Sequence, residues 1–172
     1  MKKLIILAAV VFGFAATTFA QNTVNKTTLN LTANASVVKP LTVTSAGNLE
    51  FGKFYSPAYT NTDLLITPAS GFAAVYNNIT PDPSSTSGIV ITYSGKIGVT
   101  PTVILPADGT LKLNSMPAST LATPIPLNVM QTITPADGLG NGFCYVGGQI
   151  FPALNQFPAN YATTFNVTLQ YP

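Results

Sequence analysis

Ser36 and Lys39 have the spacing that a serine nucleophile and its lysine base share in penicillin-binding enzymes. On a helix, side chains three residues apart lie on one face, and the lysine could then take the proton of the serine. The residues before Lys39 alternate between apolar and polar types instead, which predicts a strand, and in a strand these two side chains point to opposite faces. We therefore interpret Lys39 as a solvated lysine at the end of a strand.

A calcium loop is a second candidate, because Asp137, Asn141 and Gly142 match three of its positions. Leu139 stands where the loop needs an oxygen ligand, and Gly148 stands where it needs a bidentate glutamate. We expect a flexible glycine loop here and no metal site.

Cys144, the single cysteine, lies between Phe143 and Tyr145, with no cationic residue close in the sequence. A reactive thiol needs a neighbour that lowers its pKa, whereas a free cysteine among aromatic residues behaves as a small hydrophobic side chain. We expect Cys144 to be buried and unreactive.

The loop Tyr55-Ser56-Pro57-Ala58-Tyr59 offers a ligand platform. Two tyrosine rings held by a proline could stack on a sugar or a peptide. The chain contains no tryptophan, which weakens the case for carbohydrate, and exposed single aromatics are common on protein surfaces. Tyr55 and Tyr59 are therefore candidate ligand contacts in a binding module.

Titratable groups are scarce in the rest of the chain. Residues 21–172 contain five lysines and five acidic residues, and no histidine or arginine. Active sites need such groups held close together, so we expect no catalytic residues and no cofactor. A net charge of zero argues against nucleic acid and anionic membranes as partners. It also permits close packing against copies of the same protein.

The N-terminus predicts secretion. Lys2 and Lys3 precede an apolar run from Leu4 to Ala16, and Thr18-Phe19-Ala20 supplies small residues for cleavage after residue 20. The run is shorter than the roughly 20 apolar residues that span a membrane, and no later segment approaches that length. We expect a signal peptide at residues 1–20 and one secreted domain at 21–172, in the periplasm, at the cell surface or outside the cell.

Period-two alternation between turn residues predicts an all-β domain. Two details go beyond this pattern: a bulge at Gly52 would bring Leu49, Phe51 and Phe54 to one face, and Pro126 should confine the start of its strand to a sheet edge. The expected strands are residues 29–37, 41–44, 49–55, 64–67, 72–77, 88–93, 102–105, 110–113, 125–133, 143–146, 149–151 and 163–171.

Three short motifs resemble those of the bacterial family called domain of unknown function 4402. They are Leu49-Glu50-Phe51-Gly52, the paired glycines in Tyr145–Ile150, and a final alternating strand that ends at Tyr171. The resemblance implies a secreted antiparallel β-sandwich of immunoglobulin-like or pilin-like type, with no established activity. The last strand also resembles the C-terminus of chaperone-usher pilins, although Ala159-Asn160 stands near where those proteins carry a glycine.

These observations favour a non-enzymatic structural or adhesive surface protein, which forms a fibre with itself or contacts other surface proteins. The alternative is a monomeric extracellular module that binds carbohydrate or peptide. In the first case the N-terminal segment could act as a donor strand for the next subunit. Its apolar positions are Leu29, Leu31, Ala33, Ala35 and Val37. The alternative is that this segment is merely the first strand of its own domain, because sequential strands usually stay in their own domain.

Overall fold

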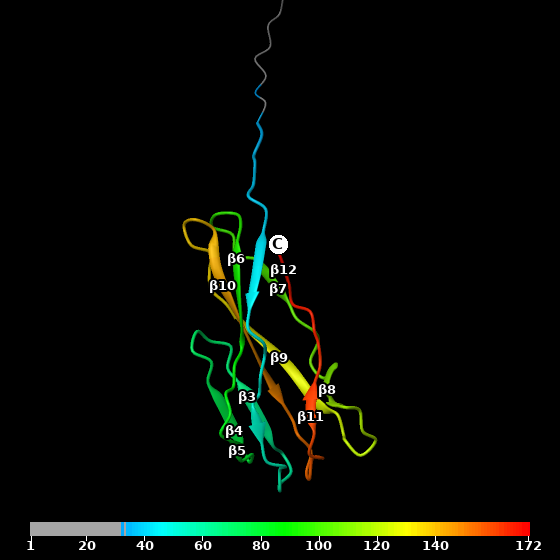
Figure 1. The fold of residues 1–172 in the computed structure, drawn as a ribbon. Helices are drawn as coiled ribbons and strands as arrows, with labels where there is room; N and C mark the ends of the chain where they lie inside the picture. The colour runs from blue at the N-terminus through cyan, green and yellow to red at the C-terminus, as the bar shows by residue number, and fades with distance from the viewer. Residues whose placement is uncertain (1–31, 33) are drawn as a thin grey trace, which may run out of the picture. The chain divides into compact units, whose positions relative to one another are not determined.

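Antiparallel strands joined by tight turns make up the described part of this protein, which in the computed structural model comprises residues 32 and 34–172 (Figure 1). None of these residues lies in a helix, so the all-β prediction is confirmed. Residues 37–172 form a unit separate from residues 1–36. The strands are β1 (Thr42–Ala46), β2 (Lys53–Phe54), β3 (Asp63–Ile66), β4 (Ala74–Asn77), β5 (Pro81–Asp82), β6 (Ile89–Ser94), β7 (Thr102–Ile104), β8 (Leu111–Met116), β9 (Ile125–Ile133), β10 (Asn141–Ile150), β11 (Asn160–Ala162) and β12 (Thr168–Gln170).

The largest sheet is antiparallel and curls like a half barrel. Its strand order is β1-β6-β10-β9-β8-β11, and β3 joins it by pairing with both β10 and β4. Two smaller sheets complete the fold, one formed by β12 and β7 and the other by β2 and β5. In the sheet order β11 is a terminal strand, and β2 belongs to a two-stranded sheet, so each has one edge without a paired strand among the described residues.

Strand β10 lies at the centre of this sheet and changes partner along its length. Asn141–Val146 pair with β6 and Gly148–Ile150 pair with β3, while β9 runs along the other edge. The change falls at Gly147, where a Cβ atom would lie 2.1 Å from the carbonyl oxygen of Ile66. Only glycine permits so close an approach of two backbones, which explains the paired glycines of the sequence.

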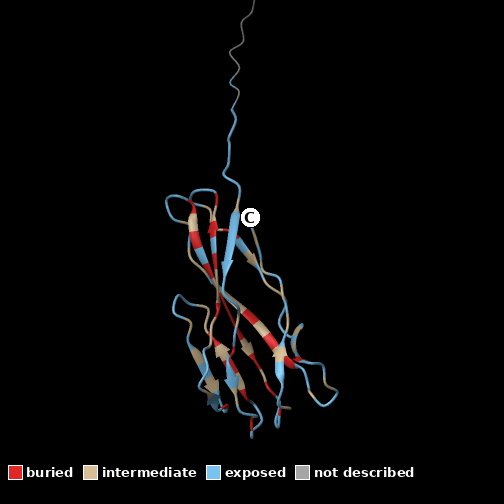
Figure 2. Ribbon diagram, viewed as in Figure 1, coloured by how far each residue is buried: buried red, intermediate tan, exposed pale blue. Residues whose placement is uncertain are grey.

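The hydrophobic core draws on β3, β6, β9 and β10 (Figure 2). In the first half of β9 every second residue is buried, namely Ile125, Leu127 and Val129, as the alternation in the sequence predicted. The most deeply buried apolar side chains of these four strands are Leu64, Ile66, Ile91, Tyr93, Ile125, Leu127, Val129, Cys144, Val146 and Ile150.

The C-terminal segment covers this core only partly. Phe165, Val167 and Leu169 pack against the core but are half-buried, and the residues between them are exposed. The backbone N–H of Lys96 donates a hydrogen bond to the hydroxyl of Tyr171, which fixes the end of the chain. The predicted alternation is therefore present, but these apolar side chains are only partly shielded from solvent.

The prediction that Pro126 lies on an edge strand is wrong. β9 pairs with β10 on one side and with β8 on the other, and Pro126 lies opposite Lys112 of β8. The N–H of Phe151 donates to the carbonyl of Pro126 (3.2 Å), so the backbone groups of this proline point toward β10. Its missing N–H costs no ladder hydrogen bond, because the β9–β10 ladder ends at Leu127 and Ile150.

Four predicted strands need correction. Residues 143–146 and 149–151 belong to one strand, β10, because the glycines between them continue the ladder. The segment 163–171 yields only β12, since residues 163–167 join no ladder. Of the predicted first strand, Thr32 and residues 34–37 lie in no strand and are exposed. Its other candidate positions, Leu29, Leu31 and Ala33, lie outside the described residues, as does the predicted signal peptide.

No helix in the described residues is long and apolar enough to cross a membrane.

Candidate functional site

The serine that Lys39 contacts is Ser94 and not Ser36. Its ammonium donates a hydrogen bond to Ser94 Oγ at 2.5 Å, beside the start of β1, and Ser36 lies in no helix. Ser94 in turn donates to Asn141 Oδ1 at 2.6 Å. These contacts tie the entry to β1 to the start of β10.

The carboxylate of Asp137 closes the turn between β9 and β10. Its Oδ1 accepts the backbone N–H groups of Asn141 (2.7 Å) and Leu139 (2.8 Å). These hydrogen bonds, first that of Asn141 and then that of Leu139, lower the pKa of Asp137. Nowhere in the described chain do three His, Cys, Asp or Glu side chains gather as a metal site would require. Asp137 therefore has a structural role in the turn.

Cys144 is fully buried in β10, as the sequence predicted. Burial raises the pKa of its thiol to about 11. At neutral pH the thiol is protonated and inaccessible, and it offers no nucleophile.

Tyr55 and Tyr59 are both exposed, at 60% and 67% of their full accessible surface. The close aromatic pairs of the described residues are Phe72 with Tyr145 and Phe143 with Tyr145, and neither loop tyrosine belongs to one. The loop thus presents two separate rings. Ser56, which lies between them in sequence, also lines a groove that the sequence did not reveal.

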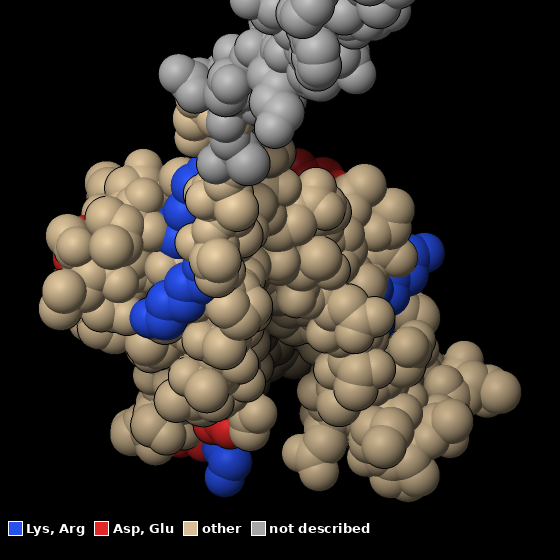
Figure 3. Space-filling model, turned by 90° about the horizontal axis from the view of Figure 1, so that it is seen from above, with Lys and Arg blue, Asp and Glu red and all other residues tan. Residues whose placement is uncertain are grey.

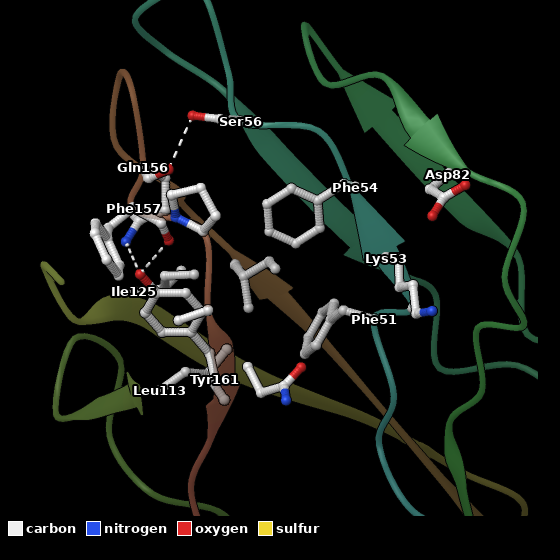
Figure 4. A pocket seen from close by; sticks show the side chains of 15 residues that line it. Phe51, Lys53, Phe54, Ser56, Asp82, Leu113, Ile125, Gln156, Phe157 and Tyr161 are labelled. Carbon is white, nitrogen blue, oxygen red and sulfur yellow. Dashed lines mark hydrogen bonds between the residues drawn. The ribbon is translucent and has the colours of Figure 1, made fainter. Parts of the chain in front are cut away.

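This groove has a volume of about 640 Å³ and lies between β2 on one wall and β11 with the preceding residues 156–159 on the other (Figure 4). Its size falls within the range of about 300–1,000 Å³ that ligand sites occupy. Three of its lining residues, Phe51, Ile125 and Ile150, are at least nine-tenths buried members of the core. Leu113 and Tyr161 are half-buried beside them. The groove therefore opens directly onto the hydrophobic core.

The first wall depends on a bend at Gly52. This residue has φ of 69°, and a Cβ atom there would lie 2.7 Å from Ser84 Oγ. The bend brings Leu49, Phe51 and Phe54 to the core, as the predicted bulge requires. Phe54 is half-buried at the groove (Figure 4), which leaves part of its ring free for a ligand.

Gln156 holds the second wall in place from a buried position. Its Nε2 donates to the carbonyl of Thr123 and to the hydroxyl of Tyr161, both at 2.7 Å. Tyr161 donates onward to the carbonyl of Phe157, also at 2.7 Å. Across the groove, Ser56 Oγ donates to the carbonyl of Gln156 at 2.9 Å (Figure 4). This network fixes both walls before any ligand binds.

Charge is nearly absent from the groove. Lys53 and Asp82 are its charged lining residues, and they face each other in the β2–β5 ladder. Their charges are opposite, so the site has no net charge to attract an ionic ligand. An apolar floor between two sheet edges suits an uncharged, extended segment of polypeptide.

A comparison with family models matched the family described as domain of unknown function (DUF4402) over residues 41–171, which is most of the chain. This chain belongs to that family. Searches of curated proteins and of solved structures found no match.

Proposed function

We propose that this member of the DUF4402 family is a secreted, non-enzymatic structural or adhesive protein of the bacterial surface, and that it assembles with copies of itself. The N-terminal signal directs it across the inner membrane, and the mature chain starts at Gln21. Its fold is a variant of the pilin-like or immunoglobulin-like sandwich in which one strand position stays open. The all-β architecture and the half-buried apolar side chains at the border of the core support this assignment.

The observation that carries the proposal is the state of the segment before β1. Thr32 and residues 34–40 lie in no strand and are exposed, and Val37 retains 98% of its accessible surface. An alternating apolar segment gains stability only when one of its faces is covered. Another copy of the chain is the simplest source of that cover, and a head-to-tail contact of this kind grows into a fibre.

The surface charge is consistent with self-association. Charged side chains are few on the face shown in Figure 3, with wide uncharged areas between them, and the surface is hollowed between two lobes. Residues 21–172 carry no net charge, so copies repel one another weakly.

Deleting residues 21–38 tests the proposal. We expect the shortened protein to keep its β-sheet circular dichroism signal, because the described part of this segment joins no strand. It should run as a monomer on size-exclusion chromatography, whereas the mature chain should form larger species. Loss of the β-sheet signal would mean that the segment belongs to its own domain, and this would overturn the proposal.

A monomeric module that binds carbohydrate or peptide is the second candidate. It is favoured by the exposed rings of Tyr55 and Tyr59 on either side of Ser56, which lines the groove. In that case the mature chain stays a monomer at all concentrations, and replacing either tyrosine with alanine weakens ligand binding.

A further inference from the structure

We propose that the groove between β2 and β11 receives residues 29–37 of a second copy of this chain as an added strand. This inference rests on the proposed self-assembly and identifies the site where the copies join. It assigns the groove a ligand class, an uncharged polypeptide strand with apolar residues at every second position. Self-assembly could occur through another surface, so the two proposals can fail separately.

One residue of β2 directs its backbone hydrogen-bonding groups away from β5. The N–H of Tyr55 donates to the carbonyl of Thr80 (2.9 Å), and the N–H of Lys53 donates to Ser84 Oγ, so both point toward β5. In an extended strand the backbone groups of successive residues point to opposite edges. The N–H and C=O of Phe54 therefore point away from β5, where they can pair with an incoming strand.

The opposite wall offers a second edge. β11 pairs with β8 through Asn160, Tyr161 and Ala162, and it ends the sheet order within the described residues. Asn160 and Tyr161 also line the groove. A strand laid between β2 and β11 would thus have a sheet edge on each side and the core beneath it, which is the environment of an interior strand.

The proposed occupant matches this environment. Residues 29–37 contain no charged side chain, and the groove has no net charge to exclude them. Side chains on one face of a strand recur every ~6.7 Å, so Leu29, Leu31, Ala33, Ala35 and Val37 can all face the core side. Their polar neighbours then face solvent. Within this segment Val37 is exposed, and Thr32 and residues 34–36 join no strand, so its described part is available for pairing.

The anchoring of Lys39 favours a second copy, and not the same chain, as the source of the segment that fills the groove. Its bond to Ser94 lies where β1 begins, since Thr42 pairs with Ser94. The groove is lined by residues that follow the other end of β1, starting at Phe51. Lys39 is thus held at the end of β1 away from the groove, and the proline at position 40 favours an extended backbone at Lys39, so the groove of a second copy is the favoured acceptor.

Two matched variants of the full mature chain test the orientation of the segment. Leu31→Asp places a charge on the face that should enter the groove, and Asn30→Asp places the same charge on the face that should meet solvent. We expect Leu31→Asp to weaken assembly by at least about tenfold in sedimentation velocity, because a buried charge without a partner is costly. Asn30→Asp should assemble like the wild type. Equal effects of the two variants would overturn the strand model.

Hydrogen exchange locates the site on the wild-type chain. Exchange at the Phe54 amide should slow by on the order of tenfold or more as concentration rises and copies assemble. In Leu31→Asp this protection should be lost while the core amides of β9 stay protected, which shows that the variant is folded. Assembly without protection at Phe54 would place the contact elsewhere and overturn this inference, while self-assembly itself would stand.

Two further outcomes would also be decisive. Protection of Phe54 that does not depend on concentration, but is lost in Leu31→Asp, would mean that the groove holds the chain's own segment. That result would overturn the assignment to a second copy. A chain that stays monomeric at every concentration would overturn the proposed function together with this inference.

Discussion

Replacing Gly147 with alanine tests the structural account of β10 most sharply. A Cβ atom at this position would lie 2.1 Å from the carbonyl oxygen of Ile66, 2.9 Å from the nitrogen of Pro68 and 3.1 Å from the carbonyl carbon of Ile66. All three atoms belong to backbone, so no side-chain rotation can relieve the overlap. Ordinary contact begins near 3.4 Å, and the backbone of β3 would have to move by about 1.3 Å.

The expected cost follows from what such a movement breaks. β3 pairs with β10 from Gly148 to Ile150, and it buries Leu64 and Ile66 completely. Overpacking in a core costs about 1–3 kcal/mol, and each lost hydrogen bond adds about 1 kcal/mol. We therefore expect the alanine variant to lose about 3 kcal/mol of unfolding free energy.

Urea unfolding followed by far-ultraviolet circular dichroism measures this loss. Gly71→Ala is the matched control, because a Cβ atom at position 71 meets nothing within 4 Å. It should leave the unfolding free energy within about 0.5 kcal/mol of the wild type. If Gly147→Ala also stayed within about 1 kcal/mol, the close approach of β3 to β10 would be wrong.

Three further predictions concern side chains in or near the core. In urea unfolding, Phe51→Ala should cost about 3–5 kcal/mol, whereas Phe165→Ala should cost about 1–2 kcal/mol because the ring of Phe165 is only half-buried. Equal losses would contradict this difference in burial. Burial raises the pKa of Cys144 from 9.0 to about 11, so the thiol ionises first in the unfolded chain. The unfolding free energy should therefore fall as the pH rises from 9 to 11, and it should fall less steeply in Cys144→Ala. Parallel pH profiles of the two proteins would argue against burial. Gln131 Oε1 is buried without a hydrogen-bond partner. Gln131→Met should therefore raise the unfolding free energy by about 1 kcal/mol in thermal or urea melts. A loss of stability would reveal a polar partner at that site.

Alternation along the sequence predicted which residues of a strand are buried better than where each strand begins and ends, because the side that a residue faces depends on its immediate neighbours. Ile125, Leu127 and Val129 are buried as expected, and the bend at Gly52 brings Phe51 to the core. The burial of Cys144 was predicted correctly for the same reason, since the prediction depended on its apolar neighbours in the sequence.

Strand pairing is a different problem, because partners come from distant parts of the chain. The wrong expectation for Pro126 arose because the sequence does not say where the β10 ladder ends. The groove was missed because its walls, which include Phe54 and Tyr161, lie more than a hundred positions apart. The one available signal was Gly52, whose bend shapes the first wall, but it did not identify the strand across the groove.

The central claim of this account is that one copy supplies the strand that fills the groove of the next. A cryo-electron microscopy map of the assembled mature protein tests it most directly. We expect continuous density between β2 and β11, with leucine-sized side chains facing Ile125 and Ile150, and a backbone that leads into β1 of a neighbouring copy. An empty groove in the assembled protein, or density that leads back to β1 of the same copy, would contradict the claim.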